Sequence, residues 1–139
     1  MKIARVLLVD DNPDNLELLA VLLSEHYMVS SYGSAAEALR ELDTVKPDVL
    51  VLDIGMAPID GLQCLQTVRA RPGYARIPAV ALTAFAREVE QKTFLAAGFQ
   101  AVVTKPIFDP REVVTVIDRM LGQPRQERIG DEPTVSVAS

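Results

Sequence analysis

Residues 5–12, RVLLVDDN, lead from a run of apolar side chains directly into two adjacent carboxylates, Asp10 and Asp11. A short continuous apolar run is typical of a parallel strand that is covered on both faces. Asn12 and Pro13 then provide a cap and a first residue for a helix. The segment predicts a buried strand, a polar turn and a helix, and the two neighbouring like charges need an explanation.

The same alternation of strand and helix continues along the chain. Residues 49–52 (VLVL) and 79–82 (AVAL) are further apolar runs, and residues 27–32 and 101–104 are weaker strand candidates. Helical spacing and helix-capping residues occupy the stretches between them. Five strands that alternate with five helices predict an α/β domain with a doubly wound parallel sheet, because right-handed crossovers place helices on both faces.

Length and composition favour one domain. The chain has 139 residues, 49% of them hydrophobic, which is enough for one core. We place this domain at residues 1–121. From residue 122 the sequence GQPRQERIGDEPTVSVAS loses its periodicity and gains Pro, Gly, Ser and charge, so we expect residues 122–139 to be a disordered tail or a linker.

Charge and the N-terminal sequence exclude several classes of function. The net charge of −5 argues against bulk attraction to nucleic acid or to anionic lipid, so we expect neither as a partner. The apolar run before Asp10 is too short for a signal sequence or a membrane span, which favours a cytoplasmic protein. Cys64, the single cysteine, excludes an intramolecular disulfide and is expected to be buried on a helix.

Polar side chains follow the predicted strands at the points where the strands end. Asp10 and Asp11 follow the first strand, Asp53 the third, Thr83 the fourth and Lys105 the fifth. Ligands of open α/β sheets bind at this edge, so we expect these groups to converge. Three carboxylates repel one another unless a cation lies among them, and their oxygens suit Mg²⁺. Capping of the first helix would explain the first two acids alone, but not the whole set.

These groups support phosphoryl transfer onto a carboxylate. Such a reaction needs an Asp nucleophile, a divalent ion that neutralises the phosphoryl oxygens, and further donors to those oxygens. Asp53 follows a buried strand and therefore has a rigid backbone, which makes it the expected nucleophile. Thr83 and Lys105 are the expected donors.

The chain resembles the receiver domain of two-component response regulators, the CheY-like family, over roughly residues 3–121. The matching fragments are VDD at 9–11, VLDIGM at 51–56, DG at 60–61, LTA at 82–84 and TKP at 104–106. The resemblance implies a flavodoxin-like three-layer sandwich around a five-stranded parallel sheet of order 2-1-3-4-5.

The resemblance also implies a role for each matched residue. Asp53 would be phosphorylated by a phosphohistidine of a partner, and Asp10, Asp11, Asp53 and the backbone carbonyl of Gly55 would bind Mg²⁺. Lys105 would pair with the phosphoryl group, and Thr83 and Ala84 would belong to the phosphoryl-binding switch. A homodimer through the fourth helix, fifth strand and fifth helix is a further implication.

The sequence departs from the family pattern at several positions. Val102 replaces the usual aromatic residue three positions before Lys105, so we expect the coupled Thr and aromatic switch to be attenuated. Ala57 stands where a Pro usually follows the Met. Gly55 and Phe85 occupy the two variable positions that border the approach of the hydrolytic water, and neither side chain positions a water molecule.

We expect a regulatory phosphoacceptor rather than an enzyme. His26 is the only histidine, so the phosphoryl donor must be a histidine kinase, a histidine phosphotransfer protein or a small acyl phosphate. No output domain follows residue 121, which favours a downstream target protein; a stand-alone regulator and the receiver of a larger protein both remain open. One alternative is a small α/β phosphatase with an Asp nucleophile. A second is a flavodoxin-like electron carrier, which needs a phosphate-binding loop after the first strand, where DDNPDN would repel the phosphate.

Overall fold

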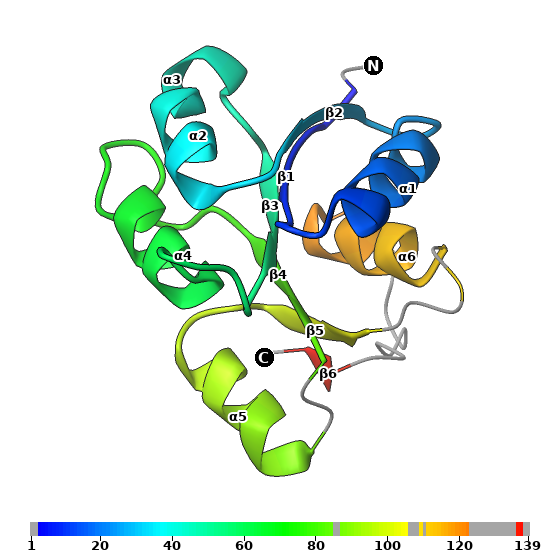
Figure 1. The fold of residues 1–139 in the computed structure, drawn as a ribbon, viewed down its shortest axis with the longest axis vertical. Helices are drawn as coiled ribbons and strands as arrows, with labels where there is room; N and C mark the ends of the chain where they lie inside the picture. The colour runs from blue at the N-terminus through cyan, green and yellow to red at the C-terminus, as the bar shows by residue number, and fades with distance from the viewer. Residues whose placement is uncertain (1–2, 85–86, 106–108, 110, 123–135, 138–139) are drawn as a thin grey trace.

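A parallel sheet forms the centre of the computed structural model, which describes residues 3–84, 87–105, 109, 111–122 and 136–137. Its parallel strands are β1 (Arg5–Val9), β2 (Met28–Tyr32), β3 (Val49–Asp53), β4 (Ala79–Thr83) and β5 (Ala101–Thr104). They are arranged in the order β2-β1-β3-β4-β5 (Figure 1). The predicted fold class and strand order are confirmed.

Helices cover both faces of this sheet (Figure 1). One face packs against α1 (Pro13–Leu23) and α6 (Arg111–Met120). The other packs against α2 (Ala35–Arg40), α3 (Leu42–Val45), α4 (Gly61–Arg69) and α5 (Glu88–Ala96). The described helices therefore complete the expected three layers, and none of them is long and apolar enough to cross a membrane.

The apolar run of β1 divides its side chains between two cores. Val6 and Leu8 pack toward α1 and α6, whereas Leu7 and Val9 pack toward α2 and α4. Successive side chains of a strand point to opposite faces, so a strand covered on both sides needs apolar residues at every position. This pattern explains why the strand appears in the sequence as an uninterrupted run. Cys64 is buried in the second core, as predicted.

Local capping explains where the helices begin. The Asn12 side chain accepts a hydrogen bond from the Asn15 N–H at the start of α1, and Ser34 accepts one from the Glu37 N–H at the start of α2. The single helix predicted between the second and third strands is split into α2 and α3, because Glu41 leaves the helical conformation at φ −97° and ψ 3°. The structure therefore has one more helix in this segment than the sequence pattern predicts.

A short sixth strand extends the sheet beyond the predicted five. β6 (Ser136–Val137) runs antiparallel to β5. It lies within the segment expected to be a tail or linker, and residues 123–135 and 138–139 of that segment fall outside the described residues. A two-residue strand is too short to produce a periodic pattern, so the sequence does not predict it.

Gly61, the first residue of α4, allows the helix to approach the end of β3. A Cβ atom at this position would lie 2.6 Å from the backbone carbonyl oxygen of Asp53 and 3.1 Å from the Cα atom of Ile54. Any side chain would therefore displace backbone rather than a flexible side chain. The glycine of the DG pair is needed here for close packing against the predicted nucleophile.

We predict that Gly61→Ala lowers the free energy of unfolding by about 1–3 kcal/mol, because overpacking forces backbone shifts. Urea denaturation at equilibrium measures the loss. Gly33→Ala is the matched control, since a Cβ at Gly33 meets no atom within 4 Å and should change stability little. Equal effects of the two substitutions would contradict the steric explanation.

Candidate functional site

Three carboxylates meet at the carboxyl ends of β1 and β3. Asp10 is fully buried, Asp53 is 4% exposed and Asp11 is exposed. Each contributes an oxygen atom to a group in which all three oxygens lie within 4.8 Å of one another. Adjacent residues in the sequence thus differ in environment, because Asp10 continues the buried strand and Asp11 belongs to the turn. The predicted convergence of these acids is present in the structure.

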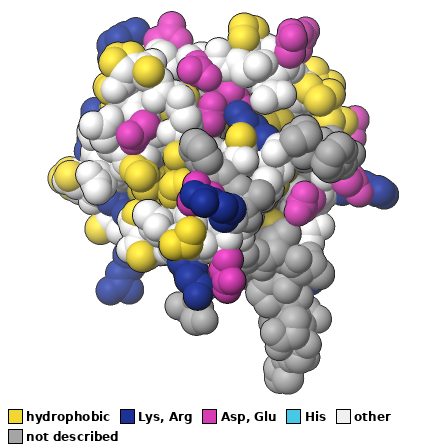
Figure 2. All heavy atoms as spheres, turned by 60° about the horizontal axis from the view of Figure 1, so that its bottom comes forward, with side chains coloured by type: hydrophobic (Ala, Val, Ile, Leu, Met, Phe, Trp, Pro, Cys, Tyr) yellow, Lys and Arg dark blue, Asp and Glu magenta, His cyan; other side chains and the backbone are white. Residues whose placement is uncertain are grey.

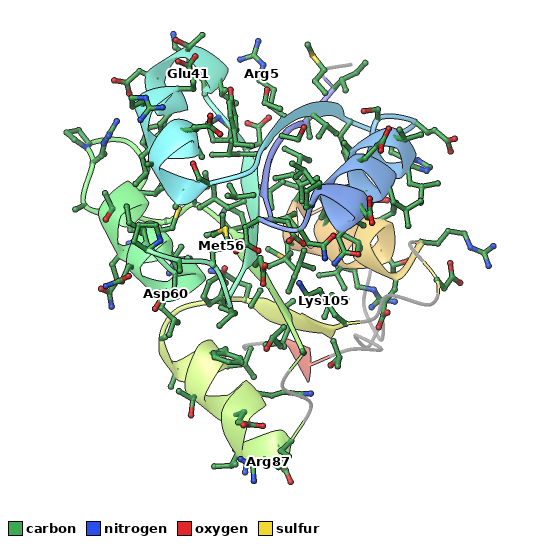
Figure 3. The ribbon with its side chains drawn as sticks, viewed as in Figure 1. Arg5, Glu41, Met56, Asp60, Arg87 and Lys105 are labelled. Carbon is green, nitrogen blue, oxygen red and sulfur yellow. The ribbon has the colours of Figure 1, made fainter. Side chains whose placement is uncertain are left out.

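Lys105 brings the opposite charge to this cluster from the end of β5 (Figure 3). Its Nζ atom lies 3.4 Å from Oδ1 of Asp53 and 3.6 Å from Oδ2 of Asp10. The Lys105 side chain is only 18% exposed, so water screens these ion pairs less than at an open surface. One ammonium group therefore faces two buried carboxylates and does not balance their charge.

Backbone N–H groups hold both buried carboxylates in place. Oδ1 of Asp10 accepts a hydrogen bond of 2.9 Å from the Asn12 N–H, and Oδ1 of Asp53 accepts one of 3.0 Å from the Gly55 N–H. These bonds fix the side chains through the turns that follow their own strands. The sequence pattern identifies the acids but gives no direct sign of these orienting bonds.

The second oxygen of Asp10 has no hydrogen-bond partner. Among the described residues, the buried side-chain polar atoms without a hydrogen-bond partner are Oδ2 of Asp10 and Nε of Arg69. Lys105 lies 3.6 Å from this oxygen but forms no hydrogen bond to it and is shared with Asp53, so the burial of the oxygen is only partly compensated. The residues present therefore fit a divalent ion bound by hard oxygen ligands at this cluster.

Burial raises the pKa of Asp10 from 3.8 to about 6. The hydrogen bond from the Asn12 N–H opposes this rise, the negative charge of Asp53 adds to it, and Lys105 opposes it. The raised pKa means that the protein bears a cost for keeping Asp10 ionised at neutral pH. A bound cation would remove that cost.

Thr83, at the end of β4, is 1% exposed and pairs in register with Thr104 of β5. Its backbone carbonyl accepts a hydrogen bond of 2.7 Å from the Lys105 N–H, which ties the end of β5 to the end of β4. Ala84 follows on the exposed side, and Phe85 lies outside the described residues. The predicted switch residues Thr83 and Lys105 thus lie on neighbouring strand ends.

Val102 and Gly55 are two positions at which the sequence departs from the family pattern, and the structure shows what surrounds each of them. Val102 is 4% exposed and packs in the core that also contains Phe94 of α5. A Cβ atom at Gly55 would lie 3.8 Å from Oδ1 of Asp53, an ordinary contact distance. Position 55 therefore borders the predicted nucleophile, and a side chain could be placed there without a clash.

Asp60 begins α4 rather than joining the acidic cluster. Its side chain accepts a hydrogen bond of 2.8 Å from the Gln63 N–H, and Gln63 Oε1 accepts one of 3.0 Å from the Asp60 N–H. This reciprocal capping box fixes the start of the helix next to Asp53. The role of Gly61 in this approach is the feature that sequence reasoning missed, and the spacing of DG after the nucleophile was its available signal.

Comparison with known proteins agrees with this geometry. The family model of the response regulator receiver domain matches residues 6–118. The chain belongs to this family. Among curated relatives, it is 38% identical over 115 residues to the 14.6 kDa protein of the sodA1 3′ region of Leptolyngbya boryana, covering 82% of this chain and 87% of that protein.

Other relatives of this receiver are longer proteins. The chain is 38% identical to the transcriptional regulatory protein TrcR of Mycobacterium tuberculosis, covering 92% of this chain and 49% of TrcR. It is 31% identical to the histidine-protein kinase BarA of Escherichia coli, covering 76% of this chain and 12% of BarA. The chain thus spans about half the length of one of these relatives and a small part of the other.

Solved receiver structures share the fold. The receiver domain of the sensor histidine kinase PA1611 of Pseudomonas aeruginosa, which has a magnesium ion in its active site cleft, superimposes with a TM-score of 0.76 at 28% identity. The match covers 87% of this chain and 99% of that one. The chemotaxis regulator CheY4 of Vibrio cholerae gives a TM-score of 0.78 at 25% identity, covering 85% of this chain and 98% of CheY4.

We predict that Asp10→Asn stabilises the metal-free receiver at pH 7 by about 1–3 kcal/mol, because it removes a buried charge and keeps an acceptor for the Asn12 N–H. The folded-state pKa of Asp10 is raised, so its ionisation cost is present above about pH 6 and absent below the unfolded value of 3.8. Urea denaturation in EDTA should therefore show the gain at pH 7 and its loss near pH 4.

Asp11→Asn is the matched control for this stability measurement, since Asp11 is exposed and its carboxylate keeps its water. It should stabilise the metal-free protein less than Asp10→Asn. Equal gains from the two variants, or a gain that persists at pH 4, would contradict a cost that arises from the burial of Asp10.

Proposed function

We propose that this chain is a phosphoacceptor of a two-component system or phosphorelay. A histidine kinase or a histidine phosphotransfer protein donates the phosphoryl group, and Asp53 accepts it in the presence of Mg²⁺. The observation that carries the proposal is the convergence of Asp10, Asp11 and Asp53. Lys105 pairs with two of these acids, and one buried carboxylate oxygen lacks a hydrogen-bond donor. The receiver family of the chain supports the same conclusion.

The chemistry follows from the positions of the charges. An oxygen of Asp53 attacks phosphorus, the bond from phosphorus to the donor imidazole breaks, and the imidazole leaves. Asp10, Asp11, Asp53 and the Gly55 carbonyl would hold Mg²⁺, which neutralises phosphoryl oxygens when bound. Lys105 lies close enough to Asp53 to pair with the transferred group, and Thr83 would signal its arrival at the end of β4.

The donor must come from outside the chain. His26, the only histidine, lies on the surface just before β2. The start of a parallel strand lies at the opposite end of the sheet from Asp53, which ends β3. A phosphatase is less well supported, because enzymes of that class need an acid/base two residues after the nucleophile and Gly55 has no side chain.

The output of the proposed switch is protein binding rather than turnover. The fourth helix, fifth strand and fifth helix expected from the sequence correspond to α5, β5 and α6. Val89 on α5 is 63% exposed and offers an apolar contact on this face. A downstream target protein, or a homodimer through this face, would read the phosphorylated state. With Val102 in place of an aromatic residue, we expect the change at β5 to be attenuated.

We predict that acetyl phosphate with Mg²⁺ adds one phosphoryl group, at Asp53, because this carboxylate has both the metal cluster and Lys105 within reach. Asp53→Asn should abolish the labelling measured by intact mass, and Asp11→Ala should slow it by removing a carboxylate from the metal cluster. Asp60→Asn is the control, since Asp60 caps α4 and should leave labelling unchanged. Undiminished phosphate on Asp53→Asn would overturn the assignment of the acceptor.

We further predict a long-lived phosphoryl group. Hydrolysis needs a water oxygen to attack phosphorus in line with the bond to Asp53, and Gly55 offers no side chain to position it. Phe85, which lies outside the described residues, has no polar group to position the water. A missing positioning contact slows such a step by about ten- to a hundredfold.

Decay of the phosphorylated protein in excess Mg²⁺, after removal of the donor, measures this lifetime. Gly55→Asn combined with Phe85→Glu should accelerate the decay about ten- to a hundredfold. Gly33→Asn provides a control, since a Cβ at Gly33 meets no atom within 4 Å. If the double variant decays at the rate of the unchanged protein, these positions do not control the lifetime.

A further inference from the structure

The first two residues of β5, Ala101 and Val102, pair at the outer edge of the sheet with a strand from the far end of the chain (Figure 1). β6 runs antiparallel to β5, with Ala101 opposite Val137 and Val102 opposite Ser136. An edge strand presents N–H and C=O groups that accept another strand. β6 therefore occupies the position that any added strand from a protein partner would take at this edge.

The local sequence fits this docking. Of the two residues of β6, Val137 is β-branched and is therefore compatible with an extended strand. At the other end of the connection, Gly122 adopts a left-handed conformation at φ 64°, and its N–H bonds to the Arg119 carbonyl. This turn ends α6, so the chain leaves the helix before it reaches β6.

β5 connects this edge to the phosphoacceptor site. Lys105 follows β5 directly, its N–H bonds to the Thr83 carbonyl and its Nζ atom lies 3.4 Å from Asp53. On the side of α5, the Gln91 amide donates a hydrogen bond of 3.5 Å to the Thr104 hydroxyl. β6 thus pairs with β5. β5 in turn leads into Lys105 and contacts α5 through Thr104.

The helix next to this edge has a surface that suits a second copy of the chain. Around the exposed Val89, α5 and its N-cap carry both signs of charge, in the ion pairs Arg87–Glu90 at 3.0 Å and Lys92–Glu88 at 3.5 Å. Figure 2, with the lower end of the molecule forward, shows charges of both signs beside hydrophobic side chains. Two copies related by a twofold axis can pair such charges with each other.

We propose that the C-terminal strand is an intramolecular ligand of the β5 edge and that it keeps a second copy of this chain off the face formed by α5, β5 and α6. The proposal rests on the proposed function only in taking that face as the dimer surface. Release of β6 would then favour self-association. If the strand is docked about ten times more often than it is free, its loss should tighten dimerisation roughly a hundredfold, because both copies must release it.

Ser136→Pro in the full chain tests this proposal. Proline removes the backbone N–H opposite Val102 and disfavours strand pairing. Ser136→Thr is the matched control, since it keeps that N–H and has a β-branched side chain. Hydrogen exchange at the Val102 amide reports docking of β6. The Lys105 N–H bonds to β4, and backbone N–H groups alternate in direction along a strand, so the Val102 N–H points away from β4 and toward β6. Analytical ultracentrifugation measures self-association.

We expect Ser136→Pro to lose protection at Val102 and to dimerise about a hundredfold more tightly, and Ser136→Thr to behave as the unchanged chain. Unchanged protection in the proline variant would show that β6 is not docked, and lost protection without tighter dimerisation would show that it excludes no second copy. Either result overturns the proposal. Labelling of Asp53 by acetyl phosphate in the same samples tests the phosphoacceptor function separately, since neither variant touches that site.

Discussion

The candidate site is built on the burial of two carboxylates beside a single ammonium group. Asp10 and Asp53 lie inside the end of the sheet, and Lys105 pairs with both at 3.6 and 3.4 Å. Two like charges about 4 Å apart repel by roughly 4 kcal/mol at an effective dielectric constant near 20. The protein holds this unfavourable charge in a rigid frame, and a bound cation would offset it.

The fold supplies that frame through backbone contacts rather than through flexible side chains. The carboxyl ends of β1, β3, β4 and β5 lie at one edge because all four strands are parallel. N–H groups of Asn12 and Gly55 orient the two buried acids, and α4 approaches Asp53 closely because Gly61 has no side chain. Under the proposed function, phosphorylation of Asp53 would therefore act directly on strand ends and helix starts.

Sequence reasoning predicts much of this arrangement, and the limits have physical causes. Uninterrupted apolar runs predict buried parallel strands, and the acids that follow them predict the site, since both signals are local. The different burial of Asp10 and Asp11 depends on where β1 ends in three dimensions. The close contact of Gly61 with Asp53 depends on how the loop between them folds. The pairing of β6 with β5 joins residues that are distant in sequence, so no local pattern contains it.

The central claim is that this carboxylate cluster is a divalent cation site. Titration of the ¹⁵N-labelled chain with Mn²⁺, a paramagnetic substitute for Mg²⁺, tests it most directly by NMR. Amide signals of residues 10–12 and 53–55 should broaden first, Mg²⁺ should restore them, and Asp10→Asn should weaken the effect. Broadening centred on other acidic groups, such as Glu37 and Glu41 near α2, or no local broadening at all, would contradict the account.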